Sequence, residues 1–180
     1  MYPVDAINHT LALATLATQI IAIALLVLFF MQRHIPDLQN SARFIGRAGL
    51  VLGFLLTTLG LVITFFYSEV LGFTPCGLCW LARVFLYPQM LIFALALWKH
   101  DRGIADYSIA LSVCGLAVSI YQHYLQMGGA DILPCPTTIT AASDCATRSV
   151  FELGYITFPL MGATLFAALI IVMLFVRSKR

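Results

Sequence analysis

Long apolar runs dominate the pattern of hydrophobic and polar positions along this chain. A helix that crosses a bilayer core of about 30 Å needs roughly 20 apolar residues. Five stretches without Asp, Glu, Lys or Arg approach or exceed this length, at residues 8–31, 48–68, 84–98, 107–126 and 155–176. The third is short unless its helix begins near Cys79, which would bring Arg83 into the first turns. The pattern predicts an all-α membrane protein with five spans.

Composition supports this class, because 61% of the 180 residues are hydrophobic and only 10% are charged. A secretory signal peptide would carry basic residues before its apolar run, whereas the first ten residues contain only Asp5 as a charged side chain. We therefore expect the first segment to remain as a membrane anchor.

The basic residues predict the orientation of the spans. Short loops rich in Lys and Arg are retained in the cytoplasm. With five spans, eight of the ten basic residues fall on one side, and only Arg83 and Arg148 fall on the other. The N-terminus and the second and fourth loops are then extracytoplasmic, and the C-terminus is cytoplasmic. The net charge of +2 reflects this topology, so no nucleic-acid partner is expected. The eight are Arg33, Arg43, Arg47, Lys99, Arg102, Arg177, Lys179 and Arg180.

Four of the five cysteines lie in the two loops that the charge pattern places outside. Cys76 and Cys79 are in the second loop, and Cys135 and Cys145 are in the fourth. Disulfides persist in extracytoplasmic compartments, so two independent signals agree. Cys114 lies inside the fourth span, where we expect a small buried side chain without a role.

The first pair forms a Cys-x-x-Cys motif. Pro75 favours a helix start, and the N-terminus of a helix stabilises a thiolate, the reactive form of cysteine. Arg83 follows Cys79 by four residues, so it lies on the same helix face and adds positive charge. A structural disulfide, half of a zinc site, and an Arg83 that extends to the membrane surface are the alternatives. Trp80 stands where a c-type haem motif requires His, and an aromatic side chain suits a flat apolar ligand.

The second pair lies in a polar loop, in which Pro134 and Pro136 stiffen the chain around Cys135. We expect this loop to be exposed. A structural bridge between Cys135 and Cys145 would contribute about 3 kcal/mol by restricting the unfolded chain. A second external dithiol near a Cys-x-x-Cys also suits electron relay by thiol–disulfide exchange. Zinc bound by all four thiolates fits poorly, because the second spacing has nine intervening residues.

The chain resembles the DsbB/BdbC family of membrane thiol oxidases. The resemblance rests on "SEVLGFTPCGLCWLARVFLYP" (68–88), "SIYQHYLQ" (119–126), "PCP" (134–136) before a nearby cysteine, and "ELGYITFPLMG" (152–162). It covers roughly residues 47–176. The family is usually a four-helix transmembrane bundle. Residues 47–180 are then that bundle, and residues 1–46 hold one extra N-terminal transmembrane helix and a cytoplasmic loop.

The resemblance implies an activity and assigns roles to the cysteines. Such proteins reoxidise a secreted, DsbA-like thioredoxin-fold protein and pass the electrons to membrane quinone, in a bacterial cytoplasmic (inner) membrane. Cys135 would react with the thiol of the partner, and Cys145 would then exchange with Cys76. Cys79 would face the quinone, and Arg83 would hold the quinone oxygen. Ubiquinone and menaquinone are not distinguished.

Further polar residues match a patch that the family places near the quinone. These are Gln122 and His123, with a weaker match at Glu69. The interval from Cys135 to Cys145 is shorter than in the better-known DsbB branch. The related vitamin K epoxide reductase group has its loop pair before the Cys-x-x-Cys, whereas here the order is reversed.

Two functions of other classes remain open at this point. One is a non-enzymatic membrane scaffold braced by external disulfides, and the other is a metal-binding or transport protein. The spacing of Gly46 and Gly49 matches the small-residue packing pattern of membrane helices imperfectly, and no packing prediction is drawn from it.

Overall fold

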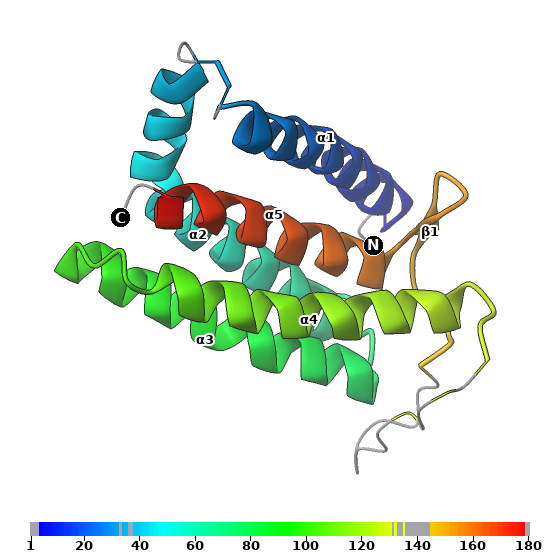
Figure 1. Cartoon of the computed structure of the whole chain (residues 1–180). Helices are drawn as coiled ribbons and strands as arrows, with labels where there is room; N and C mark the ends of the chain where they lie inside the picture. The colour runs from blue at the N-terminus through cyan, green and yellow to red at the C-terminus, as the bar shows by residue number, and fades with distance from the viewer. Residues whose placement is uncertain are drawn as a thin grey trace.

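The computed structural model describes residues 4–32, 34–35, 38–130, 132, 135 and 145–178 (Figure 1). Within these residues, five helices are long and apolar enough to cross a membrane. The prediction of an all-α bundle of four helices plus one N-terminal helix is confirmed, and the chain is a multi-pass membrane protein. The helices are α1 (Val4–Met31), α2 (Leu38–Phe65) with its π-helical continuation η1 (Phe66–Val70), α3 (Gly77–Lys99), α4 (Ala105–Gln126) and α5 (Phe158–Ser178).

Helix α5 occupies the centre of the bundle. It contacts α1, α2 and α4, whereas α3 contacts α2 and α4 (Figure 1). In the most apolar 18-residue window of α5, 61% of the residues are buried, against 17% in α1. Helix α1 therefore lies at the edge of the bundle and leaves most of its surface to lipid.

Several close contacts between helices depend on glycine, and two of them place a glycine against an aromatic ring. Gly53 of α2 lies against the ring of Phe93 in α3, and Gly115 of α4 lies against the ring of Phe166 in α5. A Cβ at either position would overlap the ring. Helices in lipid associate largely by close packing of this kind, so these contacts fix the relative positions of the helices that carry the site.

The helices extend beyond some of the predicted spans. Helix α2 begins ten residues before residue 48, because Arg43 and Arg47 are good helix formers and continue the helix past the apolar run. Helix α3 begins at Gly77, so the third span has the earlier start, near Cys79, and not the start at residue 84. Arg83 therefore lies in the second turn of α3.

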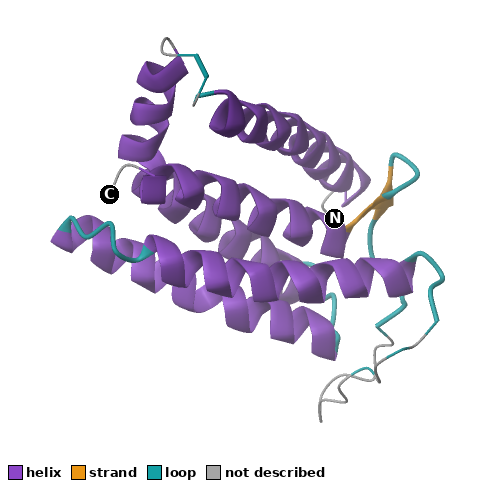
Figure 2. Cartoon of the chain, in the orientation of Figure 1, coloured by secondary structure: helices purple, strands orange, loops and turns teal. Residues whose placement is uncertain are grey.

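A short β-hairpin precedes α5 in place of the predicted helix start at Tyr155. Strand β1 (Phe151–Glu152) pairs antiparallel with β2 (Ile156–Thr157), as Figure 2 shows in orange. Leu153 and Gly154 form the turn with φ angles of 52° and 79°. Two-residue strands are too short to produce a recognisable alternating pattern, which is why the sequence did not predict them.

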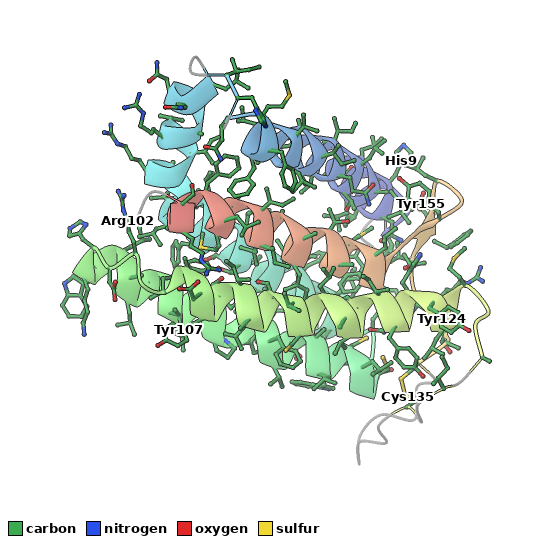
Figure 3. All side chains as sticks on the ribbon, viewed as in Figure 1. His9, Arg102, Tyr107, Tyr124, Cys135 and Tyr155 are labelled. Carbon is green, nitrogen blue, oxygen red and sulfur yellow. A yellow bond between two sulfur atoms is a disulfide. The ribbon has the colours of Figure 1, made fainter. Side chains whose placement is uncertain are left out.

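The two ends of the bundle carry different chemistry. Figure 3 shows Arg102 and Tyr107 at one end, and His9, Tyr155, Tyr124 and Cys135 at the other. The basic α3–α4 connection and the cysteine loop thus lie at opposite ends. Arg33, Lys179 and Arg180, which were part of the charge argument, lie outside the described residues.

Candidate active site

The first dithiol lies at the N-terminus of α3. Cys76 is the N-cap residue, and its Sγ accepts a hydrogen bond from the backbone N–H of Cys79 at 3.4 Å. Both cysteines are free thiols, and their sulfur atoms are 3.0 Å apart. A disulfide has an S–S length of about 2.05 Å. The pair can therefore close with a sulfur movement of about 1 Å.

Gln122 of α4 holds both sulfurs of this pair. Its Nε2 lies 3.1 Å from Sγ of Cys76 and 3.0 Å from Sγ of Cys79, and its side chain is buried. An amide N–H is a donor only, so this arrangement favours negative charge on sulfur. Gln122 is one of the polar residues singled out in the sequence, and the structure brings it to the dithiol.

The surroundings of Cys76 favour its protonated form. The hydrogen bond with Cys79 raises the pKa of Cys76 above its ordinary value, and burial raises it further. Backbone N–H groups at the start of α3 act in the opposite direction and lower this pKa, so the thiolate expected at the helix N-terminus stays a prediction. The buried donor Gln122 and the helix N-terminus can stabilise only one negative charge in so small a volume, because two thiolates in contact would repel each other.

Arg83 lies in the interior, one turn beyond Cys79. It is 6% exposed, which disagrees with a side chain that extends to the membrane surface. Its Nη2 donates to the backbone O of Thr64 at 3.1 Å, and its Nη1 donates to Oγ of Ser68, in η1, at 3.4 Å. Among the described residues no carboxylate pairs with this guanidinium. A guanidinium has five N–H donors, so donors remain for an oxygen bound beside it.

Cys79, Arg83 and Gln122 share one cavity. It has a volume of about 240 Å³ and is lined mainly by apolar side chains of α1, α2, α3, α4 and α5. The guanidinium of Arg83 and the sulfur of Cys79 thus border a cavity that is otherwise mainly apolar. This combination, an apolar pocket with a few converging polar groups, is typical of a site for an organic ligand.

Three residues that the sequence analysis considered do not line this cavity. Nδ1 of His123 lies 2.8 Å from Oγ1 of Thr157, which joins α4 to the hairpin. Its role in acceptor binding stays a prediction. Glu69 is exposed at the end of η1. Trp80 is 44% exposed and turns outward, with its ring centroid 5.3 Å from Cζ of Arg83, so it does not offer a flat surface to a ligand in the cavity.

The second dithiol packs directly beside the first. Cys135 and Cys145 form a disulfide with a Cα–Cα distance of 6.0 Å. Cys145 is 1% exposed and belongs to one apolar cluster with Cys76, Leu78 and Leu125, against which Cys79 and Cys135 also pack. The expectation of an exposed loop is therefore wrong at Cys145. Pro134, Pro136 and residues 137–144 lie outside the described residues.

Contacts that the sequence analysis missed hold the segment after Cys145. Nε2 of Gln126 donates to the backbone O of Thr147 at 3.0 Å, and Nε of Arg148 donates to the backbone O of Gln126. Gln126 follows Gln122 by one helical turn, and this spacing was the signal available in the sequence. The remaining cysteine, Cys114, is exposed on the outer face of α4, so the prediction of burial there is wrong.

These features define a membrane protein built for thiol–disulfide redox chemistry, with two adjacent dithiols at one end of a helix bundle and an apolar cavity that reaches one of them. The chain belongs to the DsbB family: the family model described as "Disulfide bond formation protein DsbB" matches residues 46–176. The suspected resemblance is confirmed, and membership gives the chain a DsbB-like thiol oxidase role in disulfide bond formation.

Curated relatives carry matching names. The "SPbeta prophage-derived disulfide bond formation protein B" of Bacillus subtilis (strain 168) is 36% identical over 132 residues, which cover 72% of this chain and 87% of the relative. A "Probable disulfide formation protein" of Chlamydia caviae is 30% identical and covers 77% of this chain and 98% of the relative. "Disulfide bond formation protein C" of Bacillus subtilis is 30% identical over 64% of this chain and 82% of the relative. No solved structure matches the chain.

Proposed function

We propose that this protein is a thiol:quinone oxidoreductase that reoxidises a secreted, DsbA-like thioredoxin-fold protein and passes the electrons to membrane quinone. One observation carries the proposal. Cys79 lines the cavity that holds Arg83, while its neighbour Cys76 packs against Cys145. The first dithiol is thus placed between a second dithiol and a ligand cavity.

The first step is exchange between the partner and the loop disulfide. A thiolate of the partner attacks Sγ of Cys135, which breaks the Cys135–Cys145 bond and forms a mixed disulfide. The second thiolate of the partner then attacks the partner sulfur that is bonded to Cys135. This closes the disulfide of the partner and releases Cys135 as a thiolate. The partner leaves with a disulfide, and the loop pair has gained two electrons.

The second step transfers those electrons to the helix pair. The thiolate of Cys145 attacks Cys76 in a Cys76–Cys79 disulfide, and Cys79 leaves as a thiolate. The thiolate of Cys135 then attacks Cys145, which breaks the Cys145–Cys76 bond, releases Cys76 as a thiolate and restores the loop disulfide. The shared cluster of these residues supports this route, and Gln122 stabilises the leaving sulfur of Cys79 by a hydrogen bond.

The cavity fits a quinone as the electron acceptor. Its lining is mainly apolar, and Arg83 is a buried cation with donors to spare beside Cys79. A bound quinone, ubiquinone or menaquinone, supplies a sink for the two electrons and two protons of each dithiol. Arg83 would donate N–H hydrogen bonds to a quinone oxygen and stabilise negative charge there. The surrounding side chains exclude water from the sulfur of Cys79.

We also propose the orientation and the division of the chain. The cysteine end faces outward from a bacterial cytoplasmic membrane, and the basic end, with the C-terminus, faces the cytoplasm. Residues 47–180 form the redox bundle, and residues 1–46 add a helix and a loop. Lipid covers the apolar outer surfaces of the helices, including Ile20, Ile23 and Leu91.

A coupled assay tests the proposal. Purified protein is mixed with a quinone and a reduced thioredoxin-fold protein, and the ring absorbance of the quinone and the thiols of the partner are followed together. We expect both to fall at equal molar rates. A non-enzymatic scaffold predicts no loss of either, and bridges that resist mild dithiothreitol. A metal-binding protein predicts stoichiometric zinc by elemental analysis, although the described ranges contain no group of three or more His, Cys, Asp or Glu side chains arranged so that it could hold a metal ion.

A further inference from the structure

Helix α1 lies outside residues 46–176, which match the family, yet it forms part of the cavity wall. The four residues that it contributes are Leu11, Ala14, Thr15 and Thr18. Their spacing of three, four and seven places them on one face of the helix. This face borders the same cavity that Cys79 and Arg83 of α3 line.

Polar contacts hold α1 in this position. Near the cysteine end, Oδ1 of Asn8 accepts a hydrogen bond from the buried hydroxyl of Tyr67 in η1. In the middle of the helix, Nε2 of Gln19 donates to Oγ1 of Thr164 in α5 at 3.1 Å. Polar groups in lipid need such partners, so these bonds oppose the departure of α1 from the bundle.

Apolar contacts hold the other end of α1. Ala22 packs in a cluster with Ala42 of α2 and with Ile171 and Phe175 of α5. Helix α1 therefore meets the α2 segment at both ends, through Tyr67 and through Ala42. Between these two contacts, the facing residues of α1 and α2 line the cavity instead.

The exposed lining residues mark the mouth of the cavity. Among the described residues that line it, only Ala14 of α1 and Leu59 of α2 are exposed. Leu59 is 58% exposed, whereas Arg83, which lines the same cavity, is 6% exposed. The cavity thus opens sideways, between α1 and α2, toward the apolar surface that lipid covers.

We propose that α1 is the outer wall of the acceptor site, and that the isoprenoid tail of the acceptor leaves through the mouth between Ala14 and Leu59. This inference rests on the proposed function. The ring must reach Cys79 and Arg83, while a long hydrocarbon tail gains by staying in lipid. Leu59 precedes Thr64, whose carbonyl binds Arg83, by five residues or about 7.5 Å along α2. A bound ring and the start of its tail span this distance.

Matched tryptophan substitutions test the mouth. Leu59→Trp is compared with Leu55→Trp, because Leu55 is 56% exposed, lies one turn away and does not line the cavity. Ala14→Trp is compared with Ala17→Trp, an exposed α1 position outside the lining. Two properties are measured for each: the KM for a quinone with and without an isoprenoid tail, and the rise in Tm that each quinone causes. The Tm readout reports binding without turnover.

We expect Leu59→Trp and Ala14→Trp to raise the KM for the tailed quinone about tenfold and to remove most of its Tm shift. The tail-free quinone should be affected much less, and the two control variants should match the wild type. If the wild type reduces quinone and gains Tm from it, but the mouth variants have the same KM and Tm shift as the control variants, the proposed wall and mouth are wrong and the proposed function stands. A wild type that neither reduces quinone nor gains Tm from it overturns the proposed function and the inference with it. The smaller pair Leu59→Phe and Leu55→Phe gives the same comparison if a tryptophan variant does not fold.

Discussion

The two dithiols are neighbours in space but are held in different ways. Cys76 and Cys79 are separated by one helical turn, and a backbone N–H and Gln122 fix their sulfurs. Cys135 and Cys145 are ten positions apart, in the connection between α4 and β1. A pair at a helix end can change between dithiol and disulfide with little backbone movement, so it suits a fixed cavity. A pair carried by a connection can meet the surface of another protein.

Serine substitutions of the cysteines should have the largest effect on oxidation of the partner, and they should distinguish the roles of the two dithiols. Cys79→Ser and Cys145→Ser should each reduce multiple-turnover oxidation of the partner to background. In a single turnover, however, Cys79→Ser keeps the Cys135–Cys145 disulfide and should still oxidise about one equivalent of partner. Cys145→Ser lacks that bond and should oxidise none. Thiol titration of the partner after rapid quenching measures the yield.

Cys114→Ser is the matched control for this experiment, because Cys114 is exposed on α4 and lies outside both pairs. Its yield and turnover should equal those of the wild type. Equal single-turnover yields for Cys79→Ser and Cys145→Ser would contradict the assignment of the partner reaction to the loop pair.

Arg83→Ala should slow the reaction of the Cys76–Cys79 pair with quinone and leave the reaction of the loop pair with the partner unchanged. Removal of a preorganised donor to a developing negative charge typically slows a reaction about 100-fold or more. We therefore expect reoxidation of the Cys76–Cys79 pair by quinone to slow by about this factor, while exchange with the partner keeps its rate. Stopped-flow measurement of each half-reaction separates the two. Arg83→Lys keeps the charge but loses the planar geometry, so its rate of reoxidation by quinone should lie between those of the wild type and Arg83→Ala. A uniform loss in both half-reactions would argue for a structural defect.

Part of this arrangement could be predicted from the sequence. The apolar runs marked the spans, because a bilayer imposes one helix length, and helical periodicity placed Arg83 one turn beyond Cys79. The charge pattern placed the two cysteine loops on one side, and the structure puts both dithiols at one end of the bundle. These features depend on local sequence or on a rule that acts along the whole chain.

Contacts between distant segments could not be predicted in the same way. The partner of Arg83 on α2 is a backbone carbonyl, which no side-chain pattern signals. The burial of Cys145 depends on how the connection folds back over Cys76 and Leu125. The glycines of α2 did carry a signal, since Gly49 and Gly53 are four residues apart and both lie against side chains of neighbouring helices. Gly46 and Gly49 are only three residues apart, so the pattern considered for them did not include this pair.

The smallest expected effect distinguishes two glutamines that are one turn apart on α4. Gln122 donates to both sulfurs of the helix pair, whereas Gln126 donates to Thr147 beyond the loop pair. Gln122→Ala removes a donor that stabilises the reduced, negatively charged sulfur, so the Cys76–Cys79 pair becomes a weaker oxidant. A loss of about 1.4 kcal/mol lowers its reduction potential by about 30 mV. Gln126→Ala should leave this potential unchanged and slow the exchange between the loop pair and the helix pair. Titration against glutathione redox buffers measures the potential, and an equal shift in both variants would show that Gln122 acts only through the packing of α4.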